Sequence, residues 1–102
     1  MIHVIATITV KPGKRDAFLT ELHRVMPSVH AEAGCLEYGA TVDVASGLSM
    51  QSPLRENVAV IVEKLESLDA LKAHTQAPHM AEYRVRVKDL VESVMLQILA
   101  PA

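Results

Sequence analysis

IHVIATITV, residues 2–10, is the stretch of this sequence that decides the fold. Every even position holds an apolar side chain, namely Ile2, Val4, Ala6, Ile8 and Val10. The odd positions mix His3 and two threonines with Ile5. Successive side chains of a strand point to opposite faces, so the pattern predicts a strand with one face in the core. Its second face mixes polar and apolar side chains. This indicates that the second face is neither fully buried nor fully exposed to solvent.

An amphipathic helix follows this strand and is predicted over residues 14–32. Its apolar side chains recur at helical spacing and fall within one narrow arc, formed by Phe18, Leu22, Val25 and Val29. Pro27 lies inside the helix and predicts a kink. His23 and His30 lie far from the arc, so we expect both to be exposed.

The rest of the chain alternates strand patterns with two shorter helices. Strands are expected over residues 35–43, 48–52, 58–64 and 93–99, the first two joined as a hairpin by the turn at 45–47. Helices are expected over residues 68–74, after Ser67 as N-cap, and over 78–91, with Pro78 in the first turn. Helices on one face of an antiparallel sheet give an α+β, ferredoxin-like domain.

Length and composition are those of one small globular domain that covers residues 1–102. Half of the residues are hydrophobic and the net charge is −2, which disfavours nucleic acid or an anionic membrane as partner. No stretch approaches the roughly 20 apolar residues of a membrane span, and no signal peptide is evident, so we expect a cytoplasmic protein. A chain this small gains stability by burying surface against a partner. We therefore expect two sheets packed face to face in a homodimer.

Two histidines and a tyrosine are the main candidates for chemistry. His79 and Tyr83 are i, i+4 neighbours on the inward face of the last predicted helix, so their polar atoms can converge. His74 precedes them across the Pro78 break. Histidine can take a proton from a phenol or an enol near neutral pH, and tyrosine can donate to an oxyanion. The alternative is that both histidines are half-buried and satisfied by backbone carbonyls.

A metal site is not expected from these histidines. Five positions along a helix rotate by about 140°, which points the two rings apart, and no HExxH pattern or third ligand is evident. The single cysteine, Cys35, excludes an intrachain disulfide and is expected to be a packed thiol. Without a phosphate loop or a nucleophile elbow, any catalysis must use acid–base and cavity chemistry on a substrate that brings its own reactivity.

Four other side chains could line a pocket between sheet and helices. Glu63 ends an apolar strand and is either solvated or inside a cavity, where it could orient a histidine. Tyr38 shares a strand face with Leu36 and is expected to pack in the core. Met50 either fills a core gap or lines an adaptable pocket. Arg86 either faces solvent or closes the pocket over an anionic oxygen.

Three motifs occur in a fixed order along the chain: EAGCLEYGATVD (32–43), VEKLESLDALKAH (62–74) and TQAPHM (75–80). Together they resemble the antibiotic biosynthesis monooxygenase family and look closest to its bacterial quinol monooxygenase branch. The similarity extends through VDVASGLSMQS (42–52) and so covers essentially the whole chain. It implies a dimeric α/β barrel with a cavity between helices and sheet in each subunit.

The resemblance also implies a reaction. Members of this branch oxidise quinols or polyphenols with O2 and need neither metal nor flavin, because a deprotonated hydroquinone can itself reduce oxygen. His74 and His79 match the family histidines, and Tyr83 matches an aromatic residue one turn later. Glu63 matches a strand-end glutamate, whereas Leu65 stands where the family has a tryptophan.

Three functions are therefore open. The leading hypothesis is a cofactor-independent monooxygenase for a quinol or polyphenol, with His74 or His79 as base and Tyr83 orienting the substrate oxygens. The second is an isomerase of a small hydroxy-ketone signalling molecule that uses the same acid–base groups. The third is a non-catalytic dimer that binds a small aromatic or apolar ligand. One fold can host many functions, so the geometry of the site has to distinguish these three hypotheses.

Overall fold

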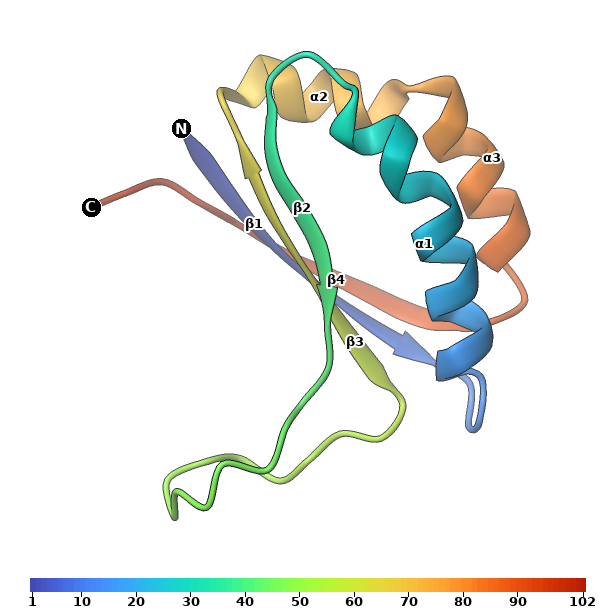
Figure 1. Cartoon of the computed structure of the whole chain (residues 1–102), viewed down its shortest axis with the longest axis vertical. Helices are drawn as coiled ribbons and strands as arrows, with labels where there is room; N and C mark the ends of the chain where they lie inside the picture. Colours follow the sequence, from blue (N-terminus) through green and yellow to red (C-terminus); the bar gives the residue numbers. More distant parts are fainter.

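A four-stranded antiparallel sheet with three helices on one face makes up the computed structural model, which describes all 102 residues (Figure 1). The elements are β1 (Ile2–Val10), α1 (Arg15–His30), β2 (Cys35–Thr41), β3 (Val58–Leu65), α2 (Leu68–Gln76), α3 (Pro78–Val87) and β4 (Val91–Leu99). The strand order is β2-β3-β1-β4. This arrangement confirms the α+β, ferredoxin-like fold predicted from the sequence.

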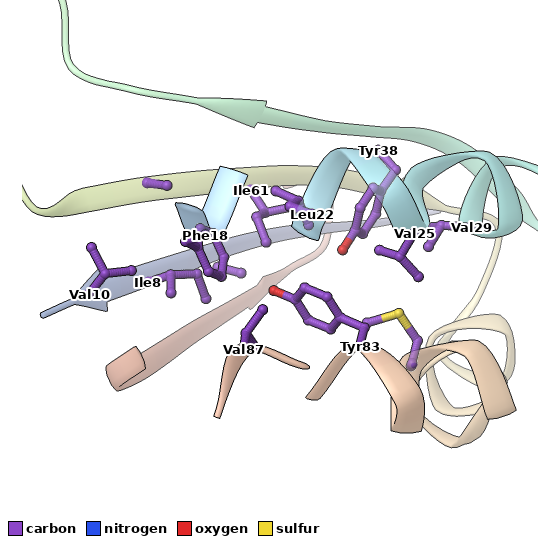
Figure 2. Close-up of a cluster of buried hydrophobic side chains, with 13 residues drawn as sticks. Ile8, Val10, Phe18, Leu22, Val25, Val29, Tyr38, Ile61, Tyr83 and Val87 are labelled. Atoms are coloured by element: carbon purple, nitrogen blue, oxygen red, sulfur yellow. The ribbon is translucent and has the colours of Figure 1, made fainter. Parts of the chain in front are cut away.

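The core lies between the central strand β1 and the helices. The even residues of β1 from Val4 to Val10 are all buried, and its odd residues are half-buried, as the alternation predicts. The apolar arc of α1 packs on this face and is almost completely buried; it consists of Phe18, Leu22, Val25 and Val29 (Figure 2). Pro27 lies inside α1, and His23 and His30 are exposed as expected.

β2 departs from the regular alternation that the sequence suggests. Its register against β3 shifts between Cys35 and Glu37, so two residues of β2 lie opposite one residue of β3. Leu36 is therefore 48% exposed, and Cys35 packs against the core in its place. The prediction that Leu36 and Tyr38 share the apolar face was wrong because of this bulge. Tyr38 itself is buried and pairs with Glu63 on β3.

Residues 42–57 form a long loop, and the strand predicted at 48–52 is absent. The Gln51 side chain accepts hydrogen bonds from the Ser46 backbone and hydroxyl and donates one to the Val44 carbonyl. These bonds satisfy the backbone locally, which replaces the ladder of a hairpin. The loop extends away from the sheet, at the bottom of Figure 1.

The end of α3 also differs from the predicted boundary. α3 ends at Val87, four residues before the predicted end, and Val91 already begins β4. Residues 88–90 form the turn between them, where the Leu90 backbone N–H donates to the Val87 carbonyl. None of the three helices has the length and hydropathy that crossing a membrane requires.

The face of the sheet that points away from the helices has no cover within the chain (Figure 1). Its central part is largely apolar and is formed by Ile5, Thr7, Val60, Val62 and Met95, which pair across β1, β3 and β4. β4 is an edge strand, and all but its first residue are exposed. A sheet with this much unshielded apolar surface is typical of a chain that packs against another layer.

Candidate active site

A cavity of about 380 Å³ lies between the sheet and the helices α2 and α3. Twelve of its 17 lining residues are hydrophobic. Four buried titratable side chains also reach it, each from a different element: Tyr38 from β2, Glu63 from β3, His74 from α2 and Tyr83 from α3. An apolar cavity with a few convergent polar groups is the usual form of a small-molecule site.

Local sequence explains where the two histidines lie. The Ser67 hydroxyl caps α2 by accepting a hydrogen bond from the Ala70 backbone at 3.1 Å, so α2 begins at residue 68. Ala77 is extended, as a residue before proline tends to be, and the helix breaks there. His74 therefore turns into the cavity, and His79 begins a separate helix with its own direction.

Glu32, in the turn between α1 and β2, connects the two histidines. One carboxylate oxygen, Oε1, lies 2.9 Å from His74 Nδ1, and the other, Oε2, lies 2.5 Å from His79 Nε2. A carboxylate can only accept, so Nδ1 of His74 donates to Glu32, and in the neutral form of this ring the lone pair is on Nε2. That Nε2 points towards Glu63 and lies 3.8 Å from its Oε1.

Glu63 is a buried carboxyl group without a hydrogen-bond partner at Oε1; its side chain is 7% exposed. Burial, and to a smaller extent the charge of Glu32, raises the pKa of the Glu63 carboxyl to about 7. The 3.8 Å between Oε1 and His74 Nε2 is too long for a hydrogen bond. A hydroxyl oxygen beside this pair, and not on the line between the two atoms, can lie about 2.7 Å from both.

The two tyrosines face the same space. Tyr38 reaches in from the sheet and Tyr83 from α3, with both rings between the two layers (Figure 2). The Tyr38 ring lies 5.5 Å from the His74 ring, and the Tyr83 ring packs edge-on against Phe18 at 6.3 Å. Burial, followed by the charge of Glu63, raises the pKa of both phenols. Both hydroxyls therefore stay protonated and can donate to an oxyanion.

Comparison with known proteins identifies the family. Residues 1–86 match the sequence profile described as "Antibiotic biosynthesis monooxygenase". The chain belongs to the antibiotic biosynthesis monooxygenase family. It is 40% identical over 103 aligned residues to the "Probable quinol monooxygenase YgiN" of Escherichia coli K12, with 99% of this chain and 98% of that protein covered. The resemblance drawn from the three motifs is confirmed.

Solved structures of related sequence share this fold. The fold is similar to the crystal structure of PA3566 from Pseudomonas aeruginosa, with a TM-score of 0.80 and 26% identity over 99% of this chain and 93% of that one. Rv0793 from Mycobacterium tuberculosis gives a TM-score of 0.79 and 27% identity over 99% and 94% of the two chains. These similarities extend over the full sheet and all three helices.

In this member of the antibiotic biosynthesis monooxygenase family, the predicted residues separate into two groups. Tyr38, Glu63, His74 and Tyr83 meet at the cavity. His79 does not line it, although it was expected on the same inward face as Tyr83. It lies in the first turn of α3, where Glu32 binds it, and its side chain is 26% exposed. A carboxylate, and not a backbone carbonyl, therefore holds both histidines.

Three other predicted residues lie outside the cavity. Met50 is 96% exposed in the 42–57 loop, because the strand expected to carry it is absent. The Arg86 guanidinium donates to Glu21 of α1 at 2.9 Å, and Arg84 lines the cavity in its place. Leu65 is buried beside the cavity without lining it, packed with Val4 and Leu71.

Glu32 is the residue that the sequence analysis missed. It lies 42 residues before His74 and 47 before His79, so no local spacing links the three. The sequence signal for Glu32 was its position at the start of the EAGC motif, two residues before Gly34. No group of three or more His, Cys, Asp or Glu side chains in the structure is arranged to hold a metal ion.

Proposed function

We propose that this protein is a monooxygenase that oxidises a quinol or polyphenol with O2 and uses neither metal nor flavin. The name of the Escherichia coli relative and the family assignment support this class of reaction. One observation carries the proposal for this chain: His74 Nε2 and the unpartnered Glu63 Oε1 lie 3.8 Å apart at the cavity, so one substrate hydroxyl beside them can contact both. A phenolic O–H bound there is held next to a base inside an apolar cavity.

The reaction begins with proton transfer from the substrate hydroxyl to His74 Nε2. The O–H bond breaks, an N–H bond forms, and the resulting imidazolium faces the Glu32 carboxylate, which stabilises it. Tyr38 and Tyr83 donate hydrogen bonds to the phenolate oxygen. The ionised quinol is electron-rich enough to react with O2. One oxygen atom enters the ring to give a hydroxyquinone, and the other leaves as water.

Oxygen uptake by metal-stripped protein with a panel of hydroquinones and naphthoquinols tests this function. We expect quinol-dependent uptake that His23→Ala, a variant at an exposed histidine of α1, leaves unchanged. Uptake no faster than that of the buffer alone would sink the proposal. A product carrying one atom from labelled O2 distinguishes oxygen insertion from simple oxidation to the quinone.

An isomerase is the second candidate, because Glu63 and His74 also form an acid–base pair. A neutral carboxyl group with a pKa of about 7 can donate a proton to a carbonyl while an imidazole removes one from the neighbouring carbon. This reaction needs no oxygen. Turnover of a small hydroxy-ketone under anaerobic conditions, followed by NMR, would favour it. Ligand binding that raises the melting temperature without any turnover would favour the binding-only alternative.

We also propose that the uncovered sheet face packs against a second copy to form a homodimer. Val62 lies in the middle of this face, opposite Ile5, and is 39% exposed. Sedimentation at micromolar concentration is expected to give the mass of two 11.1 kDa chains. A stable monomer under these conditions would rule the dimer out.

Val62→Lys is expected to weaken this dimer on the order of 100-fold, because burying an unpaired charge costs several kcal/mol. Val85→Lys is the matched control: Val85 is 76% exposed on α3, on the other side of the molecule from this sheet face. Both variants are checked for folding by circular dichroism. Equal dissociation constants for Val62→Lys and the wild type would place the interface elsewhere.

A further inference from the structure

The cavity has a buried end and an open end. Glu63 and His74 lie at the buried end, and Val94 and Leu96 of β4 line the open end, where both are more than half exposed. β1 separates β3 from β4 in the sheet, so Glu63 and Leu96 lie at least two strand spacings apart, about 10 Å. A ligand that fills the cavity therefore crosses β1, from the buried acid–base pair to the solvent-exposed edge.

Two positively charged side chains form part of the open end. Arg84 of α3 and Lys88, which follows α3, both line the cavity and are exposed. Residues four apart on a helix share one face, so both side chains lie along the same rim. Arg84 donates a hydrogen bond to the Thr75 carbonyl, which fixes the guanidinium beside the cavity. Neither Arg84 nor Lys88 forms an ion pair with a carboxylate, whereas their neighbour Arg86 pairs with Glu21.

The two ends of the cavity differ in charge. Glu63 at the buried end is a carboxyl group, so it repels an anion whenever it is ionised. The wall between the two ends is mainly hydrophobic, and placing a charge against it costs free energy. Burial and the charge of Glu63 raise the pKa of the Tyr83 phenol, and the charge of Arg84 partly opposes this rise, so the field of Arg84 extends into the cavity. The cavity therefore matches a ligand that is neutral at its buried end and negative at its open end.

We propose that the substrate is a fused-ring quinol with a carboxylate, bound by Arg84 and Lys88 at the open end, while its reacting hydroxyl lies at the buried end. This inference rests on the proposed function, since it names the class of quinol that the same cavity takes. One ring is too short to join two groups about 10 Å apart, whereas two fused rings with a substituent at each end approach this length. A carboxylate suits the rim because Arg and Lys both donate charge-assisted hydrogen bonds to it.

Three stable naphthols test this assignment without turnover. In 6-hydroxy-2-naphthoate the carboxylate and the hydroxyl lie at opposite ends of the two rings. The amide 6-hydroxy-2-naphthamide has nearly the same shape but no charge, and 3-hydroxy-2-naphthoate carries its carboxylate next to the hydroxyl. None of the three is a quinol, so binding is measured without oxidation, by naphthol fluorescence in a chain that has no tryptophan.

For the wild type we expect 6-hydroxy-2-naphthoate to bind with a dissociation constant about tenfold lower than that of the amide. The gain is modest because both cations are exposed. High salt lowers this ratio of dissociation constants, since it screens exposed charges. The compound 3-hydroxy-2-naphthoate shows no such gain, because its carboxylate cannot reach the rim while its hydroxyl lies at the buried end.

Variants at the rim assign the gain to particular side chains. Arg84→Gln and Lys88→Gln are each expected to lower the ratio about threefold, and the double variant is expected to bring it to about one. Lys72→Gln is the matched control for the loss of one positive charge: Lys72 is exposed on α2 and does not line the cavity, so the ratio stays at about ten. Circular dichroism checks that each variant is folded.

Equal dissociation constants for 6-hydroxy-2-naphthoate and its amide in the wild type would overturn the assignment, and this comparison needs no variant. A ratio that survives in the double variant, or that falls equally in Lys72→Gln, would overturn the role of Arg84 and Lys88. Equal affinity for the two naphthoates would overturn the placement of the carboxylate across the cavity from the hydroxyl. The proposed function fails separately: neutral naphthoquinols that give no oxygen uptake contradict the oxygenase and leave the anion site intact, whereas equal binding of acid and amide leaves oxygen uptake intact.

Discussion

His74→Gln is expected to lower kcat for quinol oxidation by about 100- to 10,000-fold, the range for loss of a general base. Glutamine fills similar space and can still hydrogen-bond to Glu32, but it offers no basic nitrogen to the cavity. The effect falls on kcat more than on KM, because the apolar walls that bind the ring are unchanged. Steady-state oxygen uptake at several quinol concentrations measures both parameters.

The control for this variant is His30→Gln. His30 is exposed on α1; its Nε2 lies 2.8 Å from the Tyr38 backbone oxygen, and its ring lies edge-on to the Tyr38 ring at 6.5 Å. We expect it to keep kcat within about twofold, since hydrogen bonds at exposed sites contribute little. A His74→Gln enzyme with more than a tenth of wild-type kcat would exclude His74 as the base. In that case Glu63, the other proton acceptor of the cavity, becomes the base.

Glu63→Gln is expected to stabilise the protein at pH 8 and to change little at pH 5. The unfolded carboxyl has an ordinary pKa near 4.5, and the folded one has a pKa of about 7. Between these values the folded chain holds a proton that the unfolded chain has lost. The free energy of unfolding therefore falls as pH rises from about 4.5 to about 7 and then levels off.

The size of this effect follows from the difference between the two pKa values, which corresponds to about 3 kcal/mol. The glutamine of Glu63→Gln is neutral at every pH. The free energy of unfolding of this variant at pH 8 should therefore be about 1–3 kcal/mol higher than that of the wild type. Urea unfolding at pH 5 and pH 8, at one protein concentration, measures the difference. Glu92→Gln, at an exposed position of β4, should show no such pH dependence. An equal effect of Glu63→Gln at both pH values would mean that the folded carboxyl titrates normally.

Periodicity predicted the parts of the fold in which one face of an element is buried. The alternation of β1 and the helical arc of α1 each identify a face, and the structure buries both. The bulge at Cys35 and the 42–57 loop were not predictable in the same way. Each depends on hydrogen bonds that replace regular pairing, and no spacing of apolar residues reports such bonds.

The sequence indicated individual residues of the candidate site, but it did not indicate the contacts between them. Tyr38, Glu63, His74 and Tyr83 were each selected from their position on a strand or helix, and they meet because four separate elements converge. A helical wheel assigned His79 to the cavity because it treats a helix as isolated. Glu32 comes from a turn on the far side of His74, and only the folded chain brings it there.

The central claim is that His74 Nε2 removes a proton from a phenolic substrate in the cavity. The most direct measurement is the absorption spectrum of 4-nitrocatechol bound anaerobically, at a pH where the free ligand is neutral. We predict that the ligand is ionised when bound to the wild type and neutral when bound to His74→Gln. A ligand that is neutral in both proteins, or ionised in both, would contradict the claim.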